Sequence, residues 1–129
     1  MLSMYDKELV SELLSQVSNA VKVALDRFEV VDSVAYFTDS PRGKEKLDSI
    51  CMLLIAIGES IKNIDKVTEK TLFVKYTQVD WKAAKGMRDI VAHHYFDIDA
   101  GEIYFVCDKK LQGLASTIDE IKIDLQDNS

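Results

Sequence analysis

Proline and glycine are scarce in this chain of 129 residues, which contains one proline and five glycines. Few positions can therefore form the tight turns that join the strands of a sheet. Leu, Ile and Val are interspersed with many Lys, Glu and Asp, as in amphipathic helices. With 47% hydrophobic residues, the chain has enough apolar mass for one core. These features predict a single all-α domain over residues 1–129, an up-down bundle of about four to five helices.

Cysteine is also rare, and the two residues Cys51 and Cys107 show no C-x-x-C spacing. Each falls in an apolar helical stripe, which predicts reduced thiols in the core. Residues 1–6 lack a basic lead and an apolar run, so no signal peptide is expected. No stretch reaches the roughly 20 apolar residues of a membrane span. We therefore expect a cytoplasmic protein with no membrane partner.

Apolar residues recur every three or four positions from about residue 5 to residue 30, which predicts a first helix with one continuous apolar face. They are Leu9, Val10, Leu13, Leu14, Val17, Ala20, Val21, Ala24, Leu25 and Phe28. The period is lost over residues 31–39, so a connecting turn is expected there, with Tyr36 and Phe37 tucked under the neighbouring helices. Ser40 and Pro41 then have the order of an N-cap and a first helical residue, and predict a second helix from Pro41 to about Ile64.

A glycine lies inside this second predicted helix. Gly58 costs on the order of 1 kcal/mol relative to alanine in a helix interior, so its presence calls for a reason. One interpretation is a close crossing with another helix. The other is that Gly58 lets the backbone approach a functional site, which the next residue, Glu59, contacts.

Three further helical segments are predicted after the second helix. A short one lies around Glu69 to Tyr76, and the next begins after an Asp80 cap. The inward residues of that helix are expected to be Trp81, Ala84, Met87 and Val91. Asp99 and Glu102 have the spacing of a capping box before a long last helix, whose apolar residues suit packing on the bundle or on a second subunit. They are Tyr104, Cys107, Leu111, Leu114, Ile118, Ile121 and Leu125.

The net charge of −6 conceals a basic region. Residues 62–88 contain seven basic and three acidic side chains, and the rest of the chain is acidic. The basic residues are Lys62, Lys66, Lys70, Lys75, Lys82, Lys85 and Arg88. They form either a positive strip that binds phosphate groups or a solvated helix surface. The overall acidity argues against tight nonspecific binding of nucleic acid and fits a basic partner.

The stretch from Met87 to Phe96 contains both histidines of the chain. In a helix, Asp89 and His93 would lie one turn apart on the same face, and Arg88 and Tyr95 would line up two turns apart. A cation, a titratable imidazole and a phenol would then share one small surface.

Simpler roles for the same residues stay open. Arg88 could pair with Asp89 or Asp97, His93 could be structural, and Tyr95 could close the end of the helix. The two adjacent histidines and the nearby aspartates could suggest a metal site. However, neighbouring helix positions point about 100° apart, and no H-x-x-x-H spacing is present, so no metal is expected.

Arg88, four residues, His93, one residue and Tyr95 give the pattern R-x-x-x-x-H-x-Y. Several other segments surround this pattern in a fixed order. They are Ile57-Gly58-Glu59, Val79-Asp80-Trp81, Gly86-Met87-Arg88-Asp89 and Tyr95-Phe96-Asp97-Ile98-Asp99. With this ordered set, the chain resembles the HepT-like proteins of the HEPN superfamily, from its first helix to about residue 122.

The resemblance implies an HEPN-type helical bundle and a toxin of a two-gene toxin–antitoxin system, of type II or a type VII-like kind. It implies a metal-independent endoribonuclease without cofactor that cleaves tRNA or mRNA. The enzyme would be a homodimer, with the catalytic residues Arg88 and His93 of both subunits in a cleft across the interface. The implied partner is a minimal nucleotidyltransferase antitoxin, which silences the toxin by transferring AMP to Tyr95. His94 fills the variable motif position, and Asp89 replaces an asparagine.

Cleavage of RNA suits these residue types. The ribose 2′-OH attacks the neighbouring phosphate, which requires a base, an acid for the leaving oxygen and a cation for the phosphorane. His93 titrates near neutrality and can transfer the proton, and Arg88 offers phosphate a fork of donors. Asp89 could orient His93 or pair with Lys85, and Glu59 is expected to support the site. Two copies across a two-fold axis would complete the set of groups.

Two functions from different classes follow. The first is the ribonuclease toxin. The second is a non-catalytic HEPN module that positions or regulates a nucleotidyltransferase, with Arg88 and Tyr95 contacting its nucleotide. Growth arrest on expression of the chain alone, abolished by Arg88→Ala or His93→Ala, would favour the enzyme.

Overall fold

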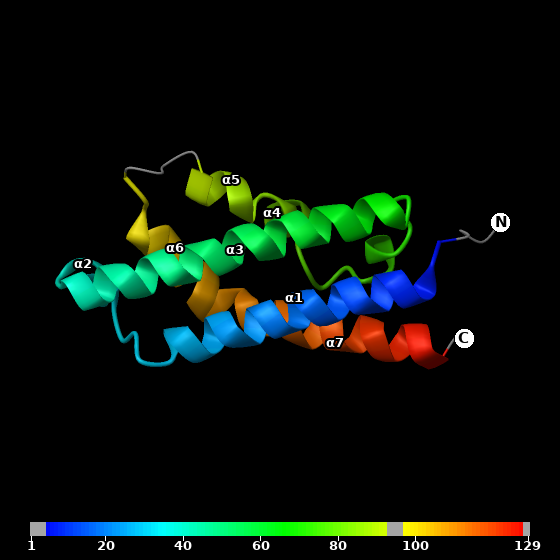
Figure 1. Ribbon diagram of the computed structural model, residues 1–129, viewed down its shortest axis with the longest axis horizontal. Coiled ribbons are helices and arrows are strands. Elements are labelled where there is room, and N and C mark those ends of the chain that lie inside the picture. The colour runs from blue at the N-terminus through cyan, green and yellow to red at the C-terminus, as the bar shows by residue number, and fades with distance from the viewer. Residues whose placement is uncertain (1–4, 93–96, 128–129) are drawn as a thin grey trace.

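Helices make up most of the described part of the chain, residues 5–92 and 97–127, in a computed structural model (Figure 1). They are α1 (Lys7–Phe28), α2 (Val34–Thr38), α3 (Pro41–Val67), the 3-10 helix η1 (Phe73–Lys75), α4 (Trp81–Lys85), α5 (Met87–Ala92), α6 (Ala100–Lys109) and α7 (Leu111–Asp127). These described residues contain no strand, and the predicted all-α bundle with a long C-terminal helix is confirmed. None of the described helices is long and apolar enough to cross a membrane.

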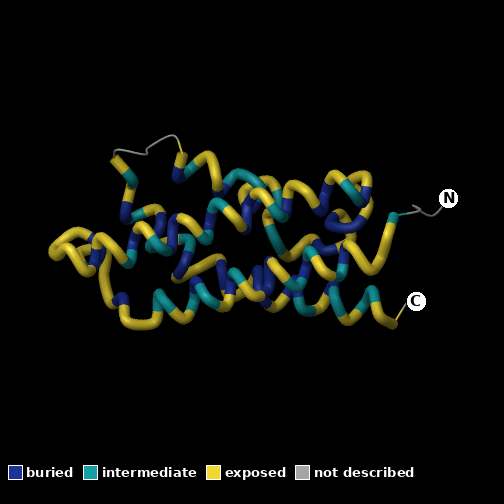
Figure 2. The backbone as a smooth tube through the Cα atoms, in the orientation of Figure 1, coloured by how far each residue is buried: buried dark blue, intermediate teal, exposed yellow. Residues whose placement is uncertain are grey.

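Three long helices, α1, α3 and α7, run along the length of the bundle, and α1 packs against both of the others (Figure 1). Buried residues gather between these helices, and exposed residues cover the outside (Figure 2). The largest fully buried side chains are Phe37, Leu14, Leu47, Ile50, Leu54, Ile57, Ile61, Ile64, Ile103, Leu111, Ile118 and Ile121. Burial of each such side chain stabilises the fold by roughly 1.5–3 kcal/mol before entropy is counted. One aliphatic core therefore joins all the long helices.

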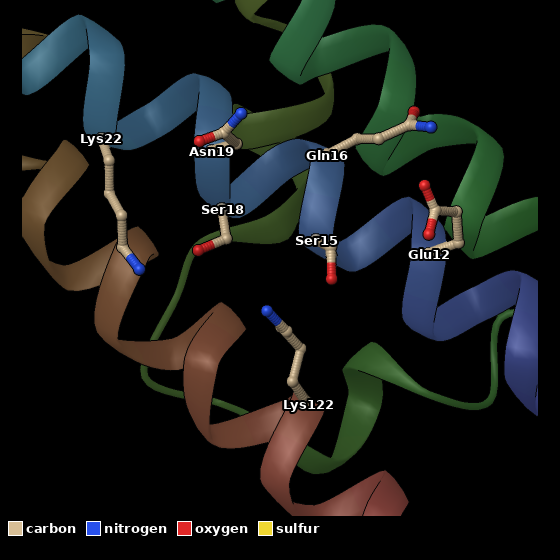
Figure 3. Close-up of a pocket in the computed structure, with 7 residues that line it drawn as sticks. All are labelled: Glu12, Ser15, Gln16, Ser18, Asn19, Lys22 and Lys122. Carbon is tan, nitrogen blue, oxygen red and sulfur yellow. The ribbon is translucent and has the colours of Figure 1, made fainter.

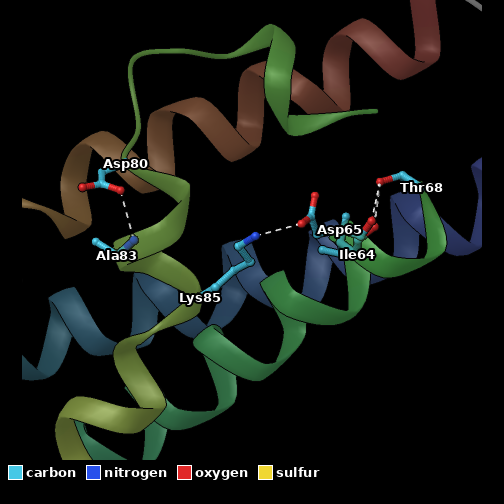
Figure 4. Close-up of polar contacts among 6 residues, drawn as sticks. All are labelled: Ile64, Asp65, Thr68, Asp80, Ala83 and Lys85. Carbon is cyan, nitrogen blue, oxygen red and sulfur yellow. Dashed lines mark hydrogen bonds and ion pairs between the residues drawn. The ribbon is translucent and has the colours of Figure 1, made fainter. Parts of the chain in front are cut away.

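Side-chain caps fix where the helices begin. Asp6 and Ser33 cap α1 and α2. The predicted caps Ser40, Asp80 and Asp99 are confirmed, since each accepts a hydrogen bond from the backbone N–H three residues later, at 3.0–3.1 Å. The bond from the Ala83 N–H to Asp80 is drawn in Figure 4. A cap of this kind is worth about 1 kcal/mol, so the sequence encodes these helix starts locally.

The connecting turn expected over residues 31–39 contains a short helix, α2. Phe37 is fully buried, as expected, and Tyr36 is half-buried. A Cβ on Gly43 would lie 1.7 Å from the carbonyl oxygen of Tyr36, so α2 rests directly on the first turn of α3. Five residues are too few to show a helical period, which is why the sequence predicted a turn here.

Two predicted helices are each divided in the structure. The helix that follows Asp80 is interrupted at Gly86, which separates α4 from α5. The helix that follows Asp99 is interrupted at Lys110, which separates α6 from α7. The break at Lys110 lets α6 contact α2 and α3 while α7 lies along α1. These breaks and α2 raise the number of helices above the predicted four to five.

The helix α7 packs on its own bundle. Four of the apolar residues predicted for the last helix, Leu111, Leu114, Ile118 and Ile121, are buried within the chain. The other three are Cys107, which is buried, and Tyr104 and Leu125, which are partly buried. The interpretation as packing within the bundle is confirmed for these positions.

The segment between α3 and α4 is held by aromatic contacts. Trp81 stacks on Phe73 of η1, with ring centroids 4.0 Å apart, and its Nε1 donates to the Tyr76 carbonyl oxygen at 2.7 Å. The short helical piece predicted here is thus a single 3-10 turn. Ala84, Met87 and Val91 are buried as predicted, which seats α4 and α5 against α3.

Candidate functional site

Arg88 lies in the first turn of α5, where it meets the middle of α3. Its Nε is 3.0 Å from Oε1 of Glu59, and the two side chains are 50% and 46% exposed. Among the ion pairs of the described residues, Arg88 pairs with Glu59, and none joins it to Asp89 or Asp97. Because half of the Arg88 side chain is exposed to solvent, the remaining donors of its guanidinium can reach an anionic ligand.

Gly58 brings the backbones of the two segments close together at this point. A Cβ on Gly58 would lie 3.2 Å from the backbone nitrogen of Arg88 and 3.3 Å from the carbonyl oxygen of Ala84. Both neighbours are backbone atoms, so a side chain could be accommodated only by moving α4 and α5. The interpretation of Gly58 as a close helix crossing is confirmed, and the crossing lies at the arginine that Glu59 contacts. A role of Gly58 in a functional site stays a prediction.

Asp89 is exposed on α5, and its backbone N–H donates to the Gly86 carbonyl oxygen at 3.0 Å. The pairing of Asp89 with Lys85 that the sequence left open does not form, because Lys85 binds Asp65 instead. His93, His94 and Tyr95 lie outside the described residues. Catalysis by His93, its orientation by Asp89, and modification of Tyr95 therefore stay predictions.

The ion pair between Lys85 and Asp65 joins α4 to α3. Lys85 Nζ lies 2.9 Å from Asp65 Oδ2, and the Asp65 side chain is 11% exposed (Figure 4). Sequence reasoning missed this pair, because nothing in the helical pattern marks Asp65 as buried. The contact fixes the end of α4 one residue before Gly86 and three residues before Arg88.

A hollow of about 460 Å³ opens beside this ion pair. It is lined by Lys62, Asp65, Lys66, Glu69, Lys70 and Lys85; we call it the basic hollow. Four of the seven residues in the predicted positive strip thus converge, whereas Lys75 and Lys82 lie elsewhere. Glu59, Lys62 and Lys66 follow one another at steps of three and four along α3, which places them on one face. The face of α3 that contributes Lys62 and Lys66 to the basic hollow therefore also carries Glu59, the partner of Arg88.

The backbone that ends α3 at this hollow is strained. Glu69 and Lys70 have φ angles of 54° and 61°, in the left-handed region that costs a non-glycine residue roughly 1–2 kcal/mol. The Lys70 N–H donates to the Asp65 carbonyl oxygen at 2.8 Å, and the Thr68 hydroxyl donates to that of Ile64 at 2.8 Å (Figure 4). The Glu69 N–H also donates to the Lys66 carbonyl oxygen at 3.1 Å, so both strained residues are held by backbone hydrogen bonds to the end of α3.

Described residues also line two further hollows. One, of about 400 Å³, lies between α1 and α7 (Figure 3) and is lined by Glu12, Ser15, Gln16, Ser18, Asn19, Lys22 and Lys122. The other, of about 360 Å³, lies between the α4–α5 and α6–α7 segments and includes Met87, Ile90 and the 51% exposed Phe105. We call the latter the apolar groove. In the described residues, no group of three or more His, Cys, Asp or Glu is arranged to hold a metal ion.

Comparison with known proteins identifies the family. The family model described as Ribonuclease HepT-like matches residues 9–121. The chain belongs to this family. The match covers the helices that carry Glu59 and Arg88, and it confirms the resemblance drawn from the motif.

Relatives of this HepT-like chain are named as candidate RNases. One from Methanocaldococcus jannaschii is 30% identical over 90 residues, which are 70% of this chain and 71% of the relative. Another from that organism, named as a gamma-glutamylcyclotransferase and candidate RNase, is 32% identical over 81 residues, 63% of this chain and 35% of the relative. One from Caldanaerobacter subterraneus subsp. tengcongensis is 34% identical over 65 residues, 50% of this chain and 54% of the relative. No solved structure matches the chain. Family and relatives together support a ribonuclease function.

Proposed function

We propose that this chain is a metal-independent endoribonuclease that cleaves tRNA or mRNA in the cytoplasm as the toxin of a two-gene toxin–antitoxin system. The observation that carries the proposal is the half-exposed side chain of Arg88, paired with Glu59, in a chain of a ribonuclease family. A guanidinium stays charged at any physiological pH and offers phosphate two parallel donors. It can therefore stabilise the extra negative charge of a phosphorane.

The proposed reaction needs two proton transfers, one from the attacking 2′-hydroxyl and one to the leaving 5′-oxygen. The ribose 2′-OH attacks the adjacent phosphorus and gives its proton to a neutral His93. The bond to the 5′-oxygen breaks, and that oxygen takes a proton from a second, protonated histidine, His93 of the partner subunit. Arg88 stabilises the charge that develops on the phosphorane oxygens. The products are a 2′,3′-cyclic phosphate and a 5′-hydroxyl.

A homodimer follows from this proposal, because one chain supplies a single Arg88 and a single His93. The apolar groove supports it, since its lining includes Ile90 of α5, the helix that carries Arg88, and the 51% exposed Phe105 of α6. Burial of an exposed aromatic ring is a favourable contribution to subunit contacts. Light scattering at a series of protein concentrations measures the subunit number directly.

A minimal nucleotidyltransferase is the proposed antitoxin. It would transfer AMP from ATP to the Tyr95 hydroxyl, releasing pyrophosphate and leaving a phosphodiester on the tyrosine. The new negative charge would lie seven residues from Arg88 in sequence and could occupy the guanidinium that RNA phosphate needs. Modification would thus block the site by the same electrostatics that binds substrate.

The test is cleavage of total RNA by purified protein in EDTA, with Arg88→Ala and His93→Ala as inactive variants. Arg42→Ala is the matched control, because Arg42 is an exposed arginine at the start of α3. We expect wild type and Arg42→Ala to cleave equally and both site variants to lose activity by at least about a hundredfold, the range of one catalytic donor or acid–base group. Treatment with the nucleotidyltransferase and ATP should silence wild type but not Tyr95→Phe.

A dimeric, unmodified wild type that cleaves none of several RNA classes would contradict the proposal. That result, together with a stable complex with the nucleotidyltransferase, would identify the chain as a non-catalytic binding module.

A further inference from the structure

We infer that the basic hollow binds the phosphodiester backbone of the RNA substrate on one side of the cleaved bond. This inference rests on the proposed ribonuclease function, and it assigns the path of the substrate strand from Arg88 along α3. The chemical class of ligand is a single-stranded polyanion held by its phosphates.

The charge of the basic hollow is the first observation. Four ammonium groups face two carboxylates, and one carboxylate, Asp65, is already paired with Lys85 at 2.9 Å. Within the described residues, Lys62, Lys66 and Lys70 form no ion pair. Three lysines therefore converge with only Glu69 to oppose them. In a chain with a net charge of −6, this local excess of positive charge is suited to an external anion.

The residue types of the lining favour a charged ligand. Every residue around the basic hollow carries a charge, and no aliphatic or aromatic side chain lines it. Pockets for apolar small molecules are lined mainly by hydrophobic residues, as the apolar groove is. Lysine acts as a flexible point charge toward phosphate, so these side chains can follow a backbone without reading its sequence.

The positions of the lysines along α3 define a path for the RNA strand. Glu59, Lys62 and Lys66 share one face of α3, and a helix rises about 1.5 Å per residue. Lys62 is therefore about 4.5 Å and Lys66 about 10.5 Å further along the helix axis than the residue that holds Arg88. A strand with its reacting phosphate at Arg88 brings its neighbouring phosphates within reach of these long side chains.

The strained turn is an independent observation. Glycine would adopt the left-handed conformation at φ 61° without cost, yet the chain has Lys70 there. Such strain persists where the surrounding bonds enforce it, and it concentrates at binding and catalytic sites. The turn here carries Lys70 to the lining of the basic hollow, so the strain coincides with a third unpaired positive charge.

The test is binding of a fluorescent single-stranded RNA of about 20 nucleotides, a length that exceeds the site of most single-strand binding domains. Binding is measured by fluorescence anisotropy at several salt concentrations. All proteins carry His93→Ala, so that the measurement does not depend on cleavage. The variant is Lys62→Ala/Lys66→Ala. The matched control is Lys44→Ala/Lys46→Ala, which removes two lysines from the other end of the same helix. Thermal denaturation of each variant verifies the fold.

We expect the hollow variant to bind at least about tenfold more weakly, and the slope of log affinity against log salt to fall by about 1.4, since each phosphate contact with a single strand contributes about 0.7. The control should match the parent. Lys62→Arg/Lys66→Arg, which keeps the charge, should restore binding.

Equal affinity and equal salt slope in the hollow variant and the control would overturn the inference, even in a protein that cleaves RNA. A parent that does not bind RNA would overturn it too. Lysine-dependent binding by a wild type that cleaves no RNA would instead refute the proposed ribonuclease function and leave the basic hollow as an RNA site. The two failures are thus distinguishable.

Discussion

Glu59 on α3 binds Arg88 on α5, with Oε1 and Nε 3.0 Å apart. The preceding residue, Gly58, lies against the backbone of the same arginine. A Cβ added to Gly58 would lie 3.2 Å from the backbone nitrogen of Arg88. Two consecutive residues of α3 therefore fix both the main chain and the side chain of Arg88. The position of the guanidinium is set by the packing of two helices and not by α5 alone.

Replacement of Glu59 by glutamine should affect activity more than stability. The pair is half exposed, and exposed ion pairs contribute about 0–1 kcal/mol to folding. Without the carboxylate, Arg88 samples more rotamers, and we expect kcat/KM for RNA cleavage to fall about tenfold, which corresponds to about 1.4 kcal/mol. Asp48→Asn, which removes the exposed pair of Lys44 and Asp48 at 3.6 Å, is the control and should leave activity unchanged. Unchanged activity in Glu59→Gln would refute a positioning role.

Alanine at Gly58 should separate helix propensity from site geometry. The substitution gains about 1 kcal/mol of propensity, but the new Cβ crowds the backbone of Arg88 and Ala84. We expect a thermal midpoint within a few degrees of wild type and a clear loss of cleavage. Gly113→Ala is the matched control, because its Cβ would meet nothing within 4 Å in the described part of α7, and it should stabilise the fold by about 0.5–1 kcal/mol. Full activity in Gly58→Ala would show that α5 tolerates displacement.

Removal of the Lys85 charge should lower the free energy of unfolding more than removal of the Asp65 charge. In Lys85→Met, the carboxylate of Asp65 stays in a site where its side chain is 11% exposed, without its cation. We expect a loss of about 2 kcal/mol in the free energy of unfolding, because an unpaired buried charge keeps its desolvation cost. Asp65→Asn should lose about half as much, since Lys85 is 32% exposed and can reach water. Urea denaturation measures both, and the reverse order would contradict the assignment of Asp65 as the buried member.

Acid should remove a stabilising contact between α1 and α7. Burial raises the pKa of Asp119, but the hydrogen bond from Ser18 at 2.8 Å and the charge of Lys22 outweigh burial and hold the pKa below its ordinary value of 3.8. Because folding lowers this pKa, the contact stabilises the fold above the unfolded value, and the benefit disappears as the pH falls through the folded value. The difference in unfolding free energy between wild type and Asp119→Asn should therefore shrink as the pH falls below 3.8. A difference that stays constant through that range would contradict the assignment.

The two cysteines should be inert in the folded protein. Both are free and buried, which confirms the sequence prediction, and burial raises the pKa of the Cys51 thiol to about 11 and that of Cys107 to about 12. Only a thiolate reacts quickly with disulfide reagents. Titration with Ellman's reagent near neutral pH should detect no thiol before unfolding and two thiols in urea. Rapid reaction of one thiol without denaturant would place that cysteine at the surface.

The beginnings of the helices were predictable because their signals are local. Ser40, Asp80 and Asp99 accept hydrogen bonds within three residues of themselves, so the caps depend on no distant part of the chain. The break at Lys110 was not predictable. Cys107, Leu111 and Leu114 keep the spacing of one continuous helix through the break, which arises because α6 and α7 pack on different neighbours.

The candidate site was likewise predictable only in part. Arg88 and Glu59 were recognisable from the motif and from the unusual Gly58, but their contact joins residues 29 positions apart and depends on how α3 and α5 cross. The sequence showed that Lys62, Lys66 and Lys70 are close along the chain. It did not show that Asp65 turns inward to Lys85, which leaves those three without an opposing partner other than Glu69.

The packing of α1 against α7 makes the core depend on two segments that are synthesised at different times. Ser18 and Asp119 bond across this contact although 101 residues separate them, so the part of α1 that packs on α7 stays uncovered until α7 has left the ribosome. Chains are made at about 5–20 residues per second, so several seconds pass between the synthesis of α1 and that of α7. A nascent chain interrupted before α7 therefore lacks a closed core.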